Sequence, residues 1–178
     1  MNYREILKSK LNQIKSESRY RTFIELERQT GRHPHALWNS PEGPKDVVIW
    51  CSNDYLGMGQ NPDTVKALTS AIDLHGTGAG GTRNISGTSA AIVLLERELA
   101  DLHGKERALV LTSGYVANEA SISAIAGLFD NALILSDEMN HASIISGIRH
   151  ARCDKEIFLH NDLEHLEELL AAQPIERP

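Results

Sequence analysis

The chain of 178 residues is long enough for one substantial core, and its 41% hydrophobic and 24% charged residues are ordinary for a soluble globular protein. Its net charge of -6 argues against a general nucleic-acid binder, which needs a basic face. No apolar run approaches the length that spans a bilayer, and the first 15 residues resemble neither a signal peptide nor an acid-poor transit peptide. We therefore expect a cytoplasmic protein without nucleic-acid or membrane partners, in which Cys51 and Cys153 stay reduced.

The predicted elements begin with an amphipathic helix, because Ile6, Leu7, Leu11 and Ile14 recur at helical spacing. This apolar stripe needs a partner, which another subunit could supply. A polar stretch with several turn residues follows, and the apolar run 47–50 is typical of a buried strand.

The next segment is predicted to hold two helices joined by a glycine-rich loop. Pro62 suits the first turn of a helix that starts near 61 and runs to about His75. The loop occupies residues 76–87. Thr88 or Ser89 then caps a helix that reaches about residue 103.

From residue 108 onward, short apolar runs alternate with helical patterns. Strands are predicted at 108–111, 132–135 and 157–159, and helices at 114–127, 142–150 and 163–172. This alternation favours right-handed βαβ units and a mostly parallel sheet, hence the α/β class. Another strand is expected after the last helix, so we expect the chain to stop in mid-domain.

The loop contains a G-x-G-x-x-G pattern over residues 76–81. A dinucleotide site is disfavoured, because that fingerprint follows a strand and here it follows a helix. A plain turn between two helices remains the alternative. So many glycines carry an entropic cost, which a backbone passing close to a ligand explains better.

Polar side chains extend this loop. Thr82 and Asn84 offer directional hydrogen bonds, and Arg83 offers a planar fork for a carboxylate. Helix capping by Ser86, Thr88 or Ser89 accounts for single residues of the run but not for all of it.

Two further motifs follow predicted strands. Ser113, Gly114 and Tyr115 open a helix, where free N–H groups and the helix dipole favour an anion such as phosphate; an empty strand–helix turn is the alternative. His141 follows the next strand, at the edge where open α/β sheets bind ligands, although a lone histidine is often structural. His160 and His165 are not expected to bind a metal together, because positions five residues apart do not share a helix face.

Together these blocks resemble the α-oxoamine synthase family over essentially the whole chain. The matching segments, in the family's order, are Trp-Cys-Ser-Asn-Asp-Tyr-Leu-Gly (50–57), Gly-Gly-Thr-Arg-Asn-Ile-Ser-Gly-Thr (80–88), Leu-His-Gly-Lys-Glu (102–106), Ser-Gly-Tyr-Val-Ala-Asn (113–118), Asn-His-Ala-Ser (140–143) and His-Asn-Asp (160–162). The resemblance implies a homodimeric enzyme that uses pyridoxal 5'-phosphate (PLP) to condense an amino acid with an acyl-CoA, with loss of carbon dioxide.

The resemblance also implies a fold and a domain layout. Residues 1–45 are expected to form an N-terminal helix and arm. Residues 46–178 are expected to form the first part of the large domain of a fold type I PLP-dependent transferase, a mostly parallel sheet with flanking helices. The Schiff-base lysine, the acidic partner of the pyridinium nitrogen and the C-terminal small domain are expected beyond Pro178, so these residues alone are expected to be inactive.

Arg-Tyr-Arg-Thr-Phe (19–23) and Thr-Arg-Asn-Ile-Ser-Gly (82–87) are most similar to members that join glycine to succinyl-CoA in tetrapyrrole and haem synthesis. The resemblance carries residue roles with it. It implies that Arg21, Thr82 and Asn84 bind the succinyl carboxylate, that Asn53 binds glycine, and that Ser136 and Lys155 bind CoA. It implies that Ser113, Gly114 and Tyr115 form the turn that binds the PLP phosphate. His141 is expected to contact the PLP ring as the catalytic residue, and Tyr55 to lie in the cofactor region.

Alternatives stay open at this point. Within the family they are an activity like that of 2-amino-3-oxobutyrate CoA ligase or of 8-amino-7-oxononanoate synthase. Outside catalysis, the alternative is a lysine-free subunit of the same fold that serves only as a binding partner.

Overall fold

The computed structural model describes residues 2–178, and the chain divides into two compact units, residues 1–78 and 79–178. The predicted division at residue 45 concerns the domains of a longer fold and stays a prediction. Among the described residues, no helix combines the length and the apolar character needed to cross a membrane.

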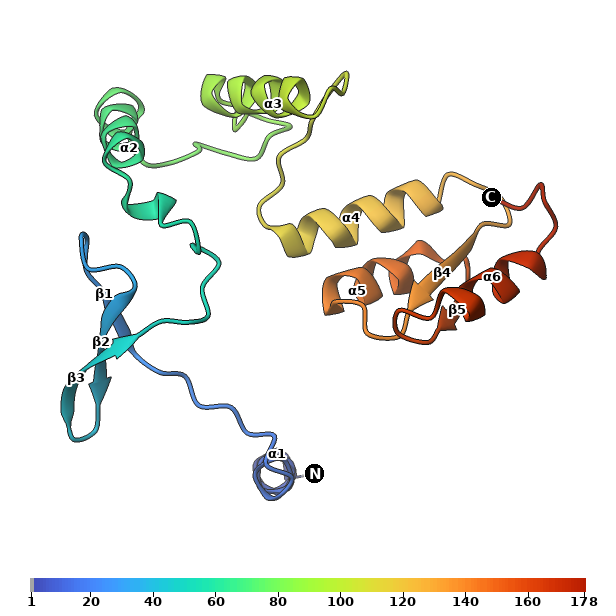
Figure 1. Cartoon of the computed structure of the whole chain (residues 1–178), viewed down its shortest axis with the longest axis horizontal. Helices are drawn as coiled ribbons and strands as arrows, with labels where there is room; N and C mark the ends of the chain where they lie inside the picture. Colours follow the sequence, from blue (N-terminus) through green and yellow to red (C-terminus); the bar gives the residue numbers. More distant parts are fainter. Residues whose placement is uncertain (1) are drawn as a thin grey trace. The chain divides into compact units, whose positions relative to one another are not determined.

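The first unit combines helices with a small antiparallel sheet (Figure 1). Its elements are α1 (Tyr3–Ser16), β1 (Leu26–Arg28), β2 (His35–Ser40), β3 (Gly43–Val48), the 3-10 helix η1 (Met58–Gln60) and α2 (Pro62–His75). The predicted first helix and the helix at Pro62 are confirmed. Asn61 caps α2 by accepting the amides of Asp63 and Thr64 at 2.9 and 3.2 Å, which fixes where this helix starts.

The prediction for the segment between the two helices was wrong in two respects. The polar stretch forms β1 and β2, which pair with β3 as a meander in the order β1-β2-β3. The turn residues were right, since Gly43 has a φ of +114° at the hairpin, but the flanking strands were missed. The apolar run 47–50 is not a buried strand: β3 is an edge strand, Val48 is 43% exposed and Trp50 is 93% exposed.

The second unit carries the α/β pattern. Its elements are α3 (Ala90–Leu102), α4 (Gly114–Ala126), β4 (Leu133–Asp137), α5 (Ala142–Ala151), β5 (Asp154–Phe158) and α6 (Leu163–Ala171). The strands β4 and β5 are parallel, with Leu133 opposite Asp154, and α5 connects them. The predicted βαβ unit is thereby confirmed, and α4 packs along α5 (Figure 1).

The predicted strand at 108–111 is wrong, because this segment pairs with no strand among residues 2–178. Side chains bind its backbone instead. The Val110 amide donates to Oε1 of Glu96 at 2.8 Å, and the Val110 carbonyl accepts from Nη1 of Arg83 at 3.3 Å. A strand requires a ladder partner, which an apolar run cannot supply by itself.

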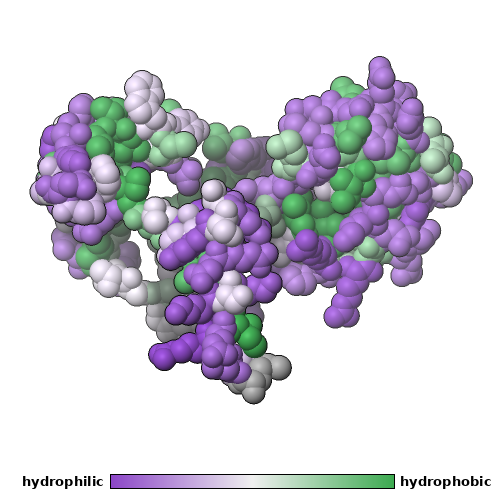
Figure 2. Space-filling view, turned by 90° about the horizontal axis from the view of Figure 1, so that it is seen from below, coloured by the Kyte–Doolittle hydropathy of each residue, from purple (hydrophilic) through white to green (hydrophobic). Residues whose placement is uncertain are grey.

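Burial within the two units is limited. The buried apolar residues are alanines and one isoleucine: Ala36, Ala100, Ala132, Ile148 and Ala151. Many large apolar side chains are exposed, and the face in Figure 2 shows green hydrophobic patches among hydrophilic residues. In the stripe of α1, Ile6, Leu7 and Leu11 are exposed and Ile14 is half-buried, so the partner of this stripe stays a prediction.

Candidate functional site

The carboxyl end of β4 leads through a tight turn into α5, and His141 lies at this junction. The Met139 amide donates to Oδ1 of Asp137 at 2.8 Å, and the Asn140 amide donates to the Asp137 carbonyl at 3.2 Å. His141 is the N-cap of α5, with Nδ1 accepting the Ser143 amide at 3.2 Å. The imidazole is thus fixed just past a strand end, where sequence reasoning expected it.

Ser143 forms a hydrogen bond with the His141 ring, and Asn118 forms one with Ser143. Ser143 is fully buried, and its Oγ lies 2.7 Å from Nδ1 of His141. Nδ2 of Asn118, on α4, donates to the same Oγ at 2.9 Å. Sequence reasoning gave neither residue a role, because Asn118 and Ser143 are 25 positions apart and only the packing of α4 on α5 joins them.

The first turn of α4 offers backbone donors. Ser113 caps the helix by accepting the Val116 amide at 3.2 Å. Within residues 2–178 the amides of Gly114 and Tyr115 have no acceptor, as expected for the first turn of a helix. A Cβ added to Gly114 would meet nothing within 4 Å, so there is open space beside these donors. This combination suits a phosphate group.

The helix start and the histidine converge. The rings of Tyr115 and His141 lie 6.2 Å apart between centroids, at an interplanar angle of 72°. Gly114, Tyr115 and His141 are therefore brought together by the packing of α4 on α5. An anion-binding turn beside an aromatic nitrogen heterocycle fits a phosphorylated planar cofactor such as PLP.

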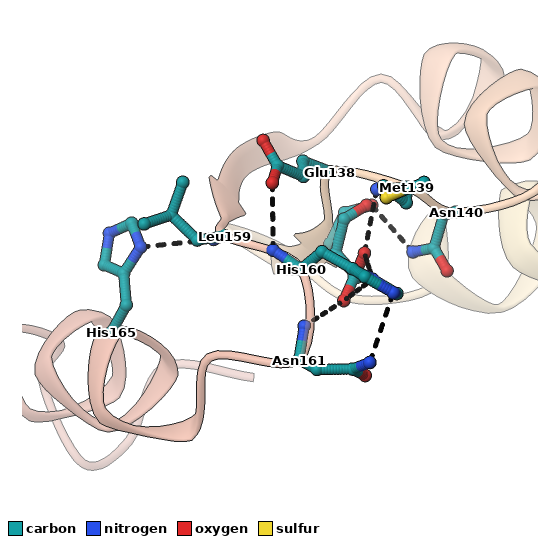
Figure 3. A network of polar contacts seen from close by, with 9 residues as sticks. Glu138, Met139, Asn140, Leu159, His160, Asn161 and His165 are labelled. Atoms are coloured by element: carbon teal, nitrogen blue, oxygen red, sulfur yellow. Dashed lines mark hydrogen bonds and ion pairs between the residues drawn. The ribbon is translucent and has the colours of Figure 1, made fainter.

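A polar network ties the end of β4 to the end of β5 (Figure 3). Asp137 accepts the Asn161 amide at 3.0 Å and Nδ1 of His160 at 2.9 Å, and the His160 amide donates to Glu138 at 3.0 Å. The Asn161 amide, followed by the His160 imidazole and the Met139 amide, lowers the pKa of Asp137. Asp137 is thus an anchor for the turn that carries His141, a role sequence reasoning missed.

Ser136 and Lys155 line one pocket on the β4–β5 sheet. The pocket has a volume of about 210 Å³ and is also lined by Arg149 and by the apolar side chains of Ile145, Ile148 and Ile157. Ser136 is buried and its Oγ accepts from Nδ2 of Asn140 at 2.9 Å. The two residues that the resemblance connects with CoA therefore lie in one pocket with an apolar wall, which Arg149 and the carboxylates of Asp137 and Glu138 also line.

The loop that holds Thr82 and Asn84 is closed on itself. The Thr82 carbonyl accepts the amides of Ile85, Ser86 and Gly87 at 3.1, 3.1 and 2.7 Å. A Cβ on Gly87 would collide with the Gly81 carbonyl, so close backbone packing explains this glycine without any ligand. Thr82 and Asn84 are exposed on this hydrogen-bonded turn.

Arg83 has a structural partner. Its guanidinium pairs with both carboxylate oxygens of Glu96, at 2.5 and 3.0 Å. Hydrogen bonds from Arg83, and then from the Val110 amide, lower the pKa of Glu96 from 4.5 to about 2. The Arg83 guanidinium group, which the sequence suggested for a substrate carboxylate, is therefore already paired with the Glu96 carboxylate.

The remaining predicted site residues lie in the first unit. Arg21 is exposed between α1 and β1, and Asn53 and Tyr55 are exposed in the segment that follows β3. None of these three side chains has a hydrogen-bond partner in the described part of the chain.

The parallel strands β4 and β5, with α5 between them, define an α/β protein, and the β4–α5 junction with the first turn of α4 is its candidate cofactor site. The family model for aminotransferase class I and II matches residues 45–178, and the chain belongs to this family. It is 57% identical to the 5-aminolevulinate synthase of Bradyrhizobium diazoefficiens and 50% identical to that of Paracoccus denitrificans, in each case over 100% of this chain and 44% of the relative.

A solved structure also matches. It is a serine palmitoyltransferase from S. paucimobilis with PLP and myriocin bound, at 27% identity and a TM-score of 0.81, over 96% of this chain and 43% of that one. The chain thus spans less than half the length of the proteins to which it is similar.

Proposed function

We propose that the protein containing these residues is a 5-aminolevulinate synthase, a PLP-dependent acyltransferase of haem and tetrapyrrole biosynthesis. It would condense glycine with succinyl-CoA to 5-aminolevulinate, CoA and carbon dioxide. The convergence of the α4 first turn with His141 is the observation that carries the proposal, because it sets the backbone donors of a helix start beside an imidazole. The similarity to 5-aminolevulinate synthases over the whole chain supports the same activity.

In this proposal the chain's own residues bind and orient the cofactor. The amides of Gly114 and Tyr115 donate to the phosphate of PLP, and Ser113 caps the helix that presents them. His141 stacks on the cofactor ring, and Tyr55 contributes to the cofactor region. PLP, when bound, supplies an electron sink for carbanion chemistry.

The substrates are proposed to use separate groups. Arg21, Thr82 and Asn84 hold the succinyl carboxylate, because a buried charge needs a cationic and hydrogen-bonding partner. The pairing of Arg83 with Glu96 supports Arg21 for this task, since Arg83 is already engaged. Asn53 binds glycine, and Ser136 and Lys155 bind CoA in their common pocket.

Assembly and domain layout follow the same proposal. The enzyme acts as a homodimer, with residues 1–45 as an N-terminal arm and residues 46–178 in the PLP-binding large domain. The exposed apolar stripe of α1 is a feature that a subunit contact would cover.

An acyl-CoA panel tests the function. The intact protein is incubated with PLP, glycine and one acyl-CoA at a time, and both CoA release and the amino ketone product are measured. We expect 5-aminolevulinate from succinyl-CoA and slower turnover of butyryl-CoA, which lacks the terminal carboxylate. A preference for an uncharged acyl group would favour a 2-amino-3-oxobutyrate CoA ligase-like or 8-amino-7-oxononanoate synthase-like activity, and PLP binding without turnover would favour a non-catalytic partner subunit.

A further inference from the structure

The hydrogen bonds around His141 assign the position of its ring proton. The Ser143 amide lies 3.2 Å from Nδ1 of His141, and a backbone N–H can only donate. Nδ1 must therefore be the acceptor, which leaves Nε2 as the protonated nitrogen of the ring. This reasoning uses the backbone alone and does not depend on how any side-chain amide is oriented.

The buried Ser143 hydroxyl supports the same assignment. A hydroxyl has one proton to donate, and its oxygen also accepts. Because Nδ2 of Asn118 donates to Oγ at 2.9 Å, the hydroxyl proton is available for Nδ1 of His141 at 2.7 Å. The donor direction thus runs from Asn118 through Ser143 to His141.

We propose that Ser143 and Asn118 are positioning residues that hold His141 in the tautomer with its proton on Nε2 and fix the direction of its ring. The Ser143 side chain contacts Nδ1 of His141, and the Asn118 side chain contacts Ser143, so the pair acts through His141. Because Ser143 is fully buried and belongs to α5, while Asn118 belongs to α4, the pair also locks the imidazole to both helices.

The consequence for the site is that Nε2 of His141 is a hydrogen-bond donor with a fixed direction. Within residues 2–178, Nε2 of His141 has no hydrogen-bond partner, and the residue is exposed. The fixed tautomer therefore presents an N–H group to an acceptor atom of the cofactor or of a substrate. This functional consequence rests on the proposed function, whereas the tautomer itself does not.

Histidine-selective ¹⁵N NMR of the intact, cofactor-free protein tests the tautomer. The His141→Gln variant identifies the signals of His141 by their loss. We expect Nδ1 to resonate as an unprotonated nitrogen and Nε2 as a protonated one. Protonation at Nδ1 in the wild-type protein would overturn the proposal.

Two variants test the positioning pair. Asn118→Asp keeps the shape but removes the N–H donor, so the Ser143 hydroxyl turns toward the new carboxylate. Nδ1 of His141 then keeps only the Ser143 amide as a donor, and its ¹⁵N resonance should shift. Ser143→Ala removes the hydroxyl and keeps the backbone donor. Ser146→Ala, on the same helix, is the matched control and should leave the ¹⁵N pattern unchanged.

Turnover supplies the second measurement. We expect kcat to fall roughly tenfold in Asn118→Asp and in Ser143→Ala, with little change in KM or in PLP affinity; hydrogen-bond partners that orient a metal-binding histidine contribute on that scale. Unchanged ¹⁵N signals and unchanged kcat in both variants would refute the role of the pair. If the proposed activity itself is absent, the ¹⁵N result still decides the tautomer, so the two failures are distinguishable.

Discussion

Arg83 and Glu96 form a two-pronged ion pair, with Nη1–Oε1 at 2.5 Å and Nη2–Oε2 at 3.0 Å. The pair joins the loop after residue 79 to α3, and through the Val110 amide it also fixes the segment before α4. Arg83 thereby anchors the turn on which Thr82 and Asn84 are exposed. The guanidinium group of Arg83 suggests substrate binding, but in this structure it holds the turn, α3 and the segment around Val110 together.

The Arg83–Glu96 pair predicts a pH dependence of stability. The folded pKa of Glu96, about 2, lies below its ordinary value of 4.5. The stabilisation is therefore fully present above pH 4.5 and is lost as the pH falls toward 2. Asp137, whose pKa is also lowered, contributes in the same direction.

Urea unfolding of the intact protein and of Glu96→Gln at about pH 6 and about pH 3 measures this effect. We expect the wild-type protein to have the higher midpoint at the upper pH and the difference to shrink at the lower pH. An equal difference at both values would show that the Glu96 charge does not stabilise the fold.

Gly87 should not tolerate a side chain. A Cβ there would collide with the Gly81 carbonyl, and the loop would have to open. We expect Gly87→Ala to lower the free energy of unfolding by roughly 1–3 kcal/mol, the usual cost of overpacking. Thermal unfolding of the intact protein measures it, and an unchanged melting temperature would contradict the close packing of this turn.

Gly114 is the counterpart of Gly87: a side chain there should leave stability unchanged but weaken cofactor binding. An added Cβ meets open space, and alanine is the better helix former, so Gly114→Ala should fold at least as stably as the wild type. The same methyl group would intrude on the proposed phosphate turn. We expect PLP affinity to fall roughly tenfold, comparable to one charge-assisted hydrogen bond. Titration with PLP followed by visible absorbance measures it, and unaltered affinity would remove this turn from the cofactor site.

Arg21 should determine acyl selectivity. We expect Arg21→Leu in the intact enzyme to lower kcat/KM for succinyl-CoA at least about tenfold, because a charge-assisted hydrogen bond to the carboxylate is lost. Butyryl-CoA should be nearly unaffected. Equal losses for both acyl-CoAs would indicate a folding or general CoA-binding role, and no loss for either would exclude Arg21 from the site.

The sequence by itself determined the elements whose ends are locally encoded. The starts of α2, α3 and α4 were predictable because Asn61, Ser89 and Ser113 accept the amides of their own first turns. The place of His141 past a strand was also predictable, since it depends on a short run of neighbouring residues, whereas the anion site at Gly114 stays a prediction.

Only the tertiary structure decided the features that depend on distant partners. The segment around Val110 is apolar enough for a strand, yet Glu96 and Arg83 bind its backbone. The role of Arg83 followed from a carboxylate 13 residues away, and the support of His141 followed from Asn118, which lies 25 positions from Ser143. Such contacts leave no period or spacing in the sequence, because the packing of separate elements creates them.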